Sequence, residues 1–333
     1  MTIHLFISQA LVSASMYSRI KAGGAPETQS ITYPALLSQV SFLSQLFRGE
    51  FIFPTAGLAR NLAHTLAGLE ADGVIKVTRR NQASYQPSSN SQQPSQPQAD
   101  DILSIDLSDA ERHSGRENFD FYCFLIWPFI EASWLGAISL LMLTPPTSHT
   151  ANATINGSSA PAWLDARTVQ SSAQLLGKTL YAQGDLSYFE AVNKETLKNA
   201  YTRFEEEGVI VIKTPPKDKK GAIPQVIRLT DEWMPQRDEV GNLKSEGRLW
   251  EFCEEVSRCR AEGKNRRDGD AAVGRVLRLV EEVGRRVWEG SGVVRVEEVR
   301  NDKEEEELKV EKDVKVERKE KRRRAPLRTK ASL

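Results

Sequence analysis

The histidines are the side chains best suited to move a proton near neutral pH, because an unperturbed imidazole titrates there. The chain has four of them, namely His4, His64, His113 and His149. His64 lies one position off the apolar stripe of a predicted helix, and the others lie in a terminus, a loop and a linker. The sequence contains no nucleophile elbow, zinc-binding H-E-x-x-H or glycine-rich phosphate loop. We therefore assign no catalytic, cofactor-binding or metal-ligating residue from the sequence.

Cysteines and carboxylates give no alternative chemistry. The three cysteines, Cys123, Cys253 and Cys259, form no C-x-x-C pair and no disulfide framework, which indicates a reducing, intracellular compartment. The acidic cluster Glu205–Glu207 is consecutive, and neighbours on a helix do not share a face. Forty-five basic and 45 acidic side chains cancel, so the whole chain has no net attraction for nucleic acid or anionic lipid.

One junction occurs twice in the chain. The segments "LEADGVIKV" (Leu69–Val77) and "FEEEGVIVI" (Phe204–Ile212) each change from a helical pattern to β-branched residues at a glycine. Each glycine follows an earlier glycine by 24 residues. Ile105–Asp109 then matches Ile227–Asp231. This order of helix, turn, helix, strand, loop and strand predicts two repeated winged-helix-like units.

The stretch Phe119–Leu143 between the two junctions is the most apolar part of the chain. A helix of this length would cross a ~30 Å hydrocarbon core. Against a crossing, Glu131 falls near its middle and Pro128 interrupts it. Three interpretations remain open: a buried helix that joins the two units, a membrane-surface or re-entrant segment, and a membrane span.

These patterns predict a mainly α fold with small β-hairpins, in which two repeated units are bridged by a long apolar helix. The predicted parts are a first helical unit with a hairpin at 1–112, a connecting helix at 113–146, a linker at 147–162, a second unit at 163–236, amphipathic helices at 237–292 and a charged, disordered tail at 293–333. Within the first unit, residues 84–99 are rich in Ser, Gln and Pro, which predicts a disordered insert.

Three segments resemble a known family in the family's order: "YPALLSQVSFLSQLFRGEFIFPTAGLARNLAHTLAGLEADGVIKV", "NFDFYCFLIWPFIEASWLGAISLLMLTPP" and "LLGKTLYAQGDLSYFEAVNKETLKNAYTRFEEEGVIVI". They look like the region C-terminal to the catalytic domain of the glycerol-3-phosphate/dihydroxyacetone-phosphate acyltransferases. The resemblance implies a place in glycerophospholipid biosynthesis at a membrane surface. In that family, acyl transfer belongs to an upstream domain with an H-x-x-x-x-D pair, in which the histidine acts as base.

This chain lacks that pair. The positions five residues after its histidines are Gln9, Leu69, Asn118 and Thr154. The resemblance therefore implies a non-catalytic module whose partner is an acyltransferase catalytic domain or a membrane surface. The protein would be intracellular and membrane-associated, at the endoplasmic reticulum, a mitochondrion or a peroxisome.

Two alternatives remain: a protein–protein adaptor and a tandem winged-helix protein that binds nucleic acid. Groove reading needs basic and amide side chains on the second helix of each unit. The residues available for it are Arg60, Asn61 and His64 in the first unit, and Lys194, Lys198, Asn199 and Arg203 in the second. Glu195 and Glu205–Glu207 offset the second set, and the neutral chain disfavours nucleic acid as a partner.

Overall fold

The computed structural model describes residues 3–21, 23–80, 101–147, 162–214, 225–262 and 269–290. It is mainly helical with two small antiparallel sheets, as the sequence predicts. The predicted insert at 84–99 and tail at 293–333 lie outside the described residues, as does almost all of the linker at 147–162. The disorder of the insert and the tail therefore stays a prediction.

The first unit contains the elements before the long apolar helix. In chain order they are α1 (Ile3–Lys21), η1 (Pro26–Gln29), α2 (Tyr33–Leu46), α3 (Leu58–Ala71), β1 (Ile75–Arg79), β2 (Ile102–Leu107) and α4 (Asp109–Ser114). Strand β2 ends two residues before the predicted end at Asp109. The reason is a helix cap, because the Ser108 hydroxyl accepts a hydrogen bond from the Glu111 N–H at 3.1 Å and so starts α4.

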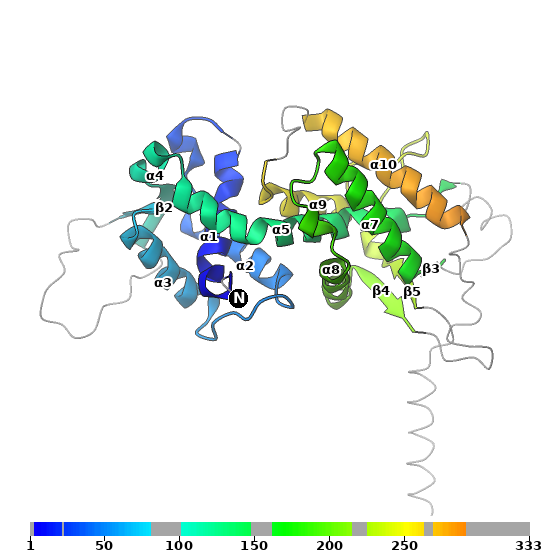
Figure 1. Cartoon of the computed structure of the whole chain (residues 1–333), viewed down its shortest axis with the longest axis horizontal. Coiled ribbons are helices and arrows are strands. Elements are labelled where there is room, and N and C mark those ends of the chain that lie inside the picture. The colour runs from blue at the N-terminus through cyan, green and yellow to red at the C-terminus, as the bar shows by residue number, and fades with distance from the viewer. Residues whose placement is uncertain are drawn as a thin grey trace, which may run out of the picture.

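Helix α5 (Glu117–Leu140) and the short η4 (Leu141–Leu143) form the centre of the molecule. Figure 1 shows α5 running from the first unit, at the left, into the second unit, at the right. The helix continues through Pro128 and packs on α1 at one end and on helices of the second unit at the other. Because neighbours cover it on several sides, its side chains are buried all round from Ile130 to Leu140, and most of them are apolar.

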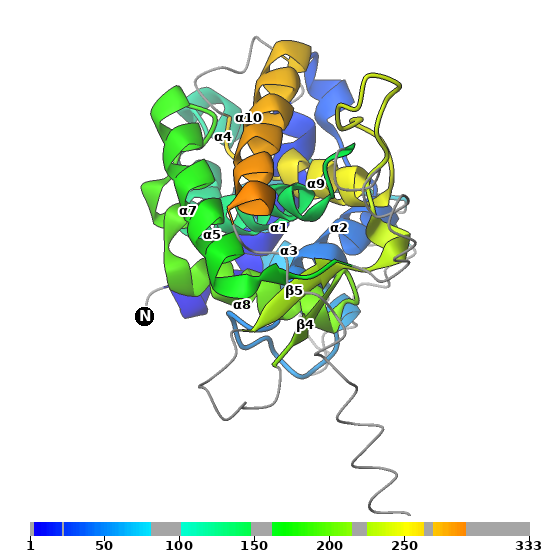
Figure 2. The same ribbon diagram turned by 90° about the vertical axis from the view of Figure 1, so that its right-hand side faces the viewer.

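The second unit follows α5. It contains β3 (Leu164–Asp165), α7 (Ala166–Gln183), η5 (Phe189–Val192), α8 (Lys194–Glu206), β4 (Ile210–Lys213), β5 (Val226–Leu229), η6 (Asp231–Trp233), α9 (Arg248–Arg258) and α10 (Gly269–Glu289). Figure 2 shows α7 and α10 side by side, with β4 and β5 below them. The sequence predicts a two-stranded hairpin in this unit, but the sheet has three strands, in the order β3–β5–β4. Leu164 and Asp165 pair with β5. The sequence does not predict this strand, because two residues are too few to show an alternating pattern.

The two glycine corners have the same local geometry. Gly73 and Gly208 have φ angles of 72° and 70°, which a residue without a Cβ adopts at little cost. In both corners, the N–H of the next residue donates a hydrogen bond of 2.9 Å to a backbone oxygen in the last turn of the preceding helix. The donor is Val74 and the acceptor Leu69 in the first corner, and the donor is Val209 and the acceptor Phe204 in the second. A hydroxyl on the far strand then donates to the glycine carbonyl, from Ser108 to Gly73 and from Thr230 to Gly208.

The hairpins that follow the corners also share one register. Ile75 pairs with Leu107 in the first, and Ile210 pairs with Leu229 in the second. A further chain segment pairs with the second strand of each hairpin. It is a single bridge from Ile31 in the first unit and β3 in the second. From α2 to β2 and from α7 to β5, the two units therefore share the order of two α-helices followed by two strands.

The buried core does not stop between the units. One continuous apolar cluster includes residues of α1, α2, α3, α5, α7, α8, α9 and α10. Helix α5 supplies the largest block of it, from Phe119 to Leu140. Parts of the chain that the sequence separates thus share one core, and the boundaries between them stay predictions.

Candidate functional site

The described histidines do not form a catalytic pair. The His4 ring lies edge-on to Phe51, with 5.8 Å between ring centroids. His113 Nδ1 lies 2.6 Å from the backbone oxygen of Asp109, and His64 is exposed on α3. Within the described residues, none of these three rings forms an ion pair with a carboxylate, so none has the acid partner that a base of this kind uses. His149 lies outside the described residues.

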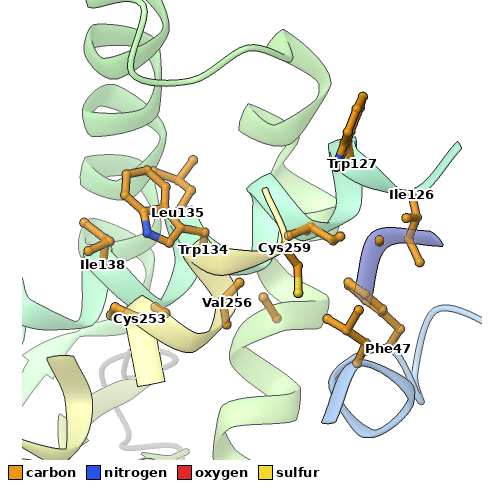
Figure 3. Packing of buried hydrophobic residues seen from close by; sticks show 14 of the residues in the cluster. Phe47, Ile126, Trp127, Trp134, Leu135, Ile138, Cys253, Val256 and Cys259 are labelled. Carbon is orange, nitrogen blue, oxygen red and sulfur yellow. The ribbon is translucent and has the colours of Figure 1, made fainter. Parts of the chain in front are cut away.

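The three cysteines are also unsuited to nucleophilic chemistry. Figure 3 shows Cys253 and Cys259, from α9 and its C-terminal cap, among apolar side chains such as Trp134 and Val256. All three thiols are buried, and burial raises the pKa of Cys259 to about 12. Burial also raises the pKa of Cys123 and of Cys253. A protonated, enclosed thiol is a poor nucleophile, so these residues serve packing.

The part of the chain that the structure describes holds no cluster of three or more His, Cys, Asp or Glu side chains that could bind a metal ion.

The polar centre of the molecule is the ion pair of Glu131 and Arg260. Glu131 is fully buried and accepts hydrogen bonds from the backbone N–H groups of Ser187 and Tyr188, both at 2.9 Å. The Arg260 guanidinium lies 3.4 Å from the Glu131 carboxylate and stacks 3.6 Å from the centroid of the Trp134 ring. Burial lowers the pKa of Arg260, while the carboxylate opposes that shift. The pair fastens the loop before η5 to the middle of α5.

This pair explains a charge that the sequence leaves unexplained. Glu131 argues against a membrane crossing on the sequence alone, but its partner lies 129 residues further along the chain. By length and composition, α5 with η4 is one helix that could cross a membrane; however, 72% of its most apolar window is buried inside the protein. The core helix of a soluble protein passes the same test, so the length of α5 says little about a membrane.

A cavity of about 610 Å³ lies beside the Glu131–Arg260 pair. Trp134 of α5 and Trp250 and Cys253 of α9 line its apolar side. The charged groups at its edge include Arg260 and Asp185, and Asp185 pairs with Arg275 at 3.4 Å. No histidine is among the described residues that line it. The cavity therefore holds charge and apolar surface but no recognisable nucleophile and base.

The residues considered for nucleic-acid binding are partly used inside the protein. Asn199 of α8 donates a hydrogen bond to Glu50 of the first unit at 2.9 Å. Arg203 is 9% exposed and pairs with Glu206 and Glu207. Asn61 donates to the backbone oxygen of Pro54. Arg60, His64, Lys194 and Lys198 are exposed. Helix α8 thus packs mainly on α5, and its Asn199 side chain also contacts the first unit.

An exposed aromatic surface runs from α5 to α7. We define it as Phe121, Phe124, Tyr181 and Phe189, all of which are exposed. Phe124 packs edge-on to Tyr188, with centroids 5.9 Å apart, and Tyr181 packs against Phe189 at 5.2 Å. Large exposed apolar patches commonly mark contact sites. The sequence does not distinguish these four residues, because α5, α7 and η5 also contribute apolar side chains to the core.

A comparison with protein-family models identifies the family of the chain. The model of the glycerol-3-phosphate acyltransferase C-terminal region matches residues 1–213, which include α1 to β4. The chain belongs to this family. The family assignment links the chain to lipid biosynthesis and confirms the resemblance seen in the sequence. A search of curated proteins finds no match.

The match to this acyltransferase family ends at Lys213, the last residue of β4. The last strand of the second unit and helices α9 and α10 therefore lie beyond it. Nonetheless α9 contributes Arg260, through the turn that follows it, to the polar centre on α5. Residues outside the matched part complete the core of the matched part.

Proposed function

We propose that this chain is a non-catalytic module of glycerophospholipid biosynthesis that packs against an acyltransferase catalytic domain. One observation carries the proposal: the chain matches the family's C-terminal region but has no H-x-x-x-x-D pair in its sequence. The described histidines, which lack carboxylate partners, support the same conclusion. The module would position or stabilise a catalytic domain that performs the acyl transfer.

The aromatic surface is the contact face that we propose for this partner. Its rings are exposed, and ring-to-ring packing holds Phe124 and Tyr181 in place. Aromatic side chains contribute strongly to protein interfaces, since they bury a large area at a small entropy cost.

We also propose that the two units are copies of one winged-helix-like fold that serves packing. The equal hydrogen bonds at Gly73 and Gly208 and the equal hairpin registers support this. In DNA-binding relatives of such folds, the helix before the hairpin enters the major groove. The contact of Asn199 with Glu50 supports a different use of α8, as a contact between the units.

The proposal is tested with purified full-length protein and a separately purified glycerol-3-phosphate acyltransferase catalytic domain. The chain alone should give no acylated product from acyl-coenzyme A and glycerol 3-phosphate, and it should bind the catalytic domain in a pull-down. Replacing both Phe121 and Phe124 with Ser should weaken that binding at least about tenfold, which corresponds to ~1.4 kcal/mol.

Leu103→Ser is the matched control, since Leu103 is an exposed apolar residue on β2, away from the aromatic surface. It should leave binding unchanged. Acyl transfer by the chain alone would contradict the non-catalytic role. Failure to bind any catalytic domain, combined with flotation on lipid vesicles, would replace the protein partner with a membrane.

A further inference from the structure

One difference between the two units lies in the groove beside α2 in the first unit and beside α7 in the second. Helices α2 and α7 bury the same face, as shown by the buried residues Leu36, Val40, Leu43 and Phe47 in the first unit and Val169, Ala173, Leu176 and Leu180 in the second. In this alignment Ser44 of α2 corresponds to Gly177 of α7. The loops that follow the two helices then take different paths.

In the second unit, the chain's own loop fills the groove. Val192 of η5 packs against Gly177 so closely that a Cβ there would lie 3.2 Å from Val192 Cγ2 and 2.5 Å from Leu135 Cδ2. The Gln174 side chain donates to the backbone oxygen of Val192 at 3.2 Å. Glu131 fastens the same loop through two backbone N–H groups. No space is left between α5 and α7 at this point.

In the first unit, the groove is open. A cavity of about 610 Å³ lies between α1, α2, α3 and the loop that follows α2. Ile52, a loop residue at its edge, is 88% exposed. Phe51 covers one side of the cavity and is held by Phe129 of α5, with 4.9 Å between ring centroids. A cavity of this size is within the range that binds small molecules.

The lining of this cavity selects for one kind of ligand. Its interior is apolar, with Leu11 and Val12 from α1 and Leu62 from α3, all of them buried. Ser41 and Ser44 add hydroxyl groups along α2. Among the described residues that line it, Arg48 at the exposed edge is the single charged side chain, and none is a carboxylate.

We propose that this cavity binds an amphiphile with one alkyl chain and an anionic headgroup. The alkyl chain would lie against α1 and α2, in the position that corresponds to that of Val192 in the second unit. The headgroup would remain at the surface beside the Arg48 guanidinium, because a buried charge without a partner is costly. This site does not depend on the proposed function, since it would bind its ligand with or without a catalytic domain.

The test is calorimetric titration of the full-length protein with dodecanoate below its micelle concentration. We expect one dodecanoate per chain. Ser44→Phe should block the cavity and weaken binding at least about tenfold. Arg48→Gln should weaken dodecanoate binding about threefold and leave dodecanol binding unchanged, as expected for a partly solvated charge pair. Lys178→Gln, an exposed lysine on α7, is the control and should have no effect.

Thermal unfolding must show that each variant folds, and Ser41→Leu serves as a second blocking variant if Ser44→Phe does not. Binding that neither variant weakens would overturn the proposal and identify adsorption to the surface. Equal binding of dodecyltrimethylammonium would overturn the anionic headgroup. Binding of the synthetic peptide Asp185–Asn193, the segment that fills the second unit, in place of dodecanoate would show that the cavity takes a peptide.

Discussion

The loop after α2 and the loop after α7 each follow the first helix of a helix–helix–hairpin segment. The loop after α7 packs into the core, whereas the loop after α2 leaves a cavity between itself and the core. The second loop buries Leu186, Ala191 and Val192 and is fastened by Glu131. The first buries Phe51 but leaves Ile52 in solvent and a cavity behind it. The glycine corners that follow are the same in both units. The two loops thus differ while the hydrogen bonds of the two glycine corners are alike, because neither loop takes part in those hydrogen bonds.

The largest expected effect comes from releasing the second loop. Glu131→Ala removes the acceptor for two N–H groups and leaves Arg260 buried without its carboxylate. Breaking a buried pair by removing one partner costs about 3–5 kcal/mol. Urea unfolding should show a loss of this size. Glu190→Ala, an exposed carboxylate on the same loop, should cost less than about 0.5 kcal/mol. A similar small loss for Glu131→Ala would mean that the pair does not hold the loop.

A second comparison adds volume to both grooves. Gly177→Leu must force its side chain against Leu135 and Val192, and overpacking of this kind costs about 1–3 kcal/mol. Ser44→Leu enters the open cavity and should change the free energy of unfolding by less than about 0.5 kcal/mol, or increase it. Equal losses in the two variants would contradict the difference between the grooves.

A third comparison removes volume. Val192→Ala deletes two buried methyl groups, at ~0.8 kcal/mol each before the cost of the cavity, so a loss of about 1.5–2.5 kcal/mol is expected. Ile52→Ala deletes exposed atoms and should cost less than about 0.5 kcal/mol. Thermal unfolding of the two variants at equal concentration measures the difference. If Ile52→Ala costs as much as Val192→Ala, the first loop is packed in solution.

The smallest expected differences in stability test whether the glycine corners at Gly73 and Gly208 are alike. Gly73→Ala and Gly208→Ala each place a Cβ on a residue with positive φ but with nothing within 4 Å of the added atom. Each should therefore cost only the conformational strain, about 1–2 kcal/mol. The two losses should agree within about 0.5 kcal/mol, as measured by urea unfolding. A large difference between them would show that the corners have unlike surroundings.

The sequence predicts the parts of the fold that follow local patterns. Apolar spacing predicts helices over Leu5–Ile20, Tyr33–Arg48 and Gly57–Ala71, and the ends of α1, α2 and α3 lie within about two residues of these bounds. The aligned segments Ile105–Asp109 and Ile227–Asp231 include part of the second strand of each hairpin, and their residues Leu107 and Leu229 pair with Ile75 and Ile210. The repeat misses β3 and the Ile31 bridge, because pairings of one or two residues have no periodicity.

Contacts between distant residues are beyond such reasoning. The sequence places Glu131 in an apolar helix but cannot find Arg260, since no spacing rule connects the two. The sequence does not predict the cavity, for a similar reason. Ser44 and Gly177 are both small residues on a helix, and only the paths of the loops make one groove open and the other filled. The absence of a catalytic pair, by contrast, is visible in the sequence because that motif is local.

Amide hydrogen exchange of the two loops tests the difference between the units most directly. The account predicts slow exchange for the Ser187 and Tyr188 amides, which donate to the buried Glu131 carboxylate, and fast exchange for the Ile52 and Phe53 amides beside the open cavity. Dodecanoate should slow exchange in the first loop and leave the second unchanged. Equal protection of both loops without ligand, or faster exchange at Ser187 and Tyr188 than at Ile52 and Phe53, would contradict it.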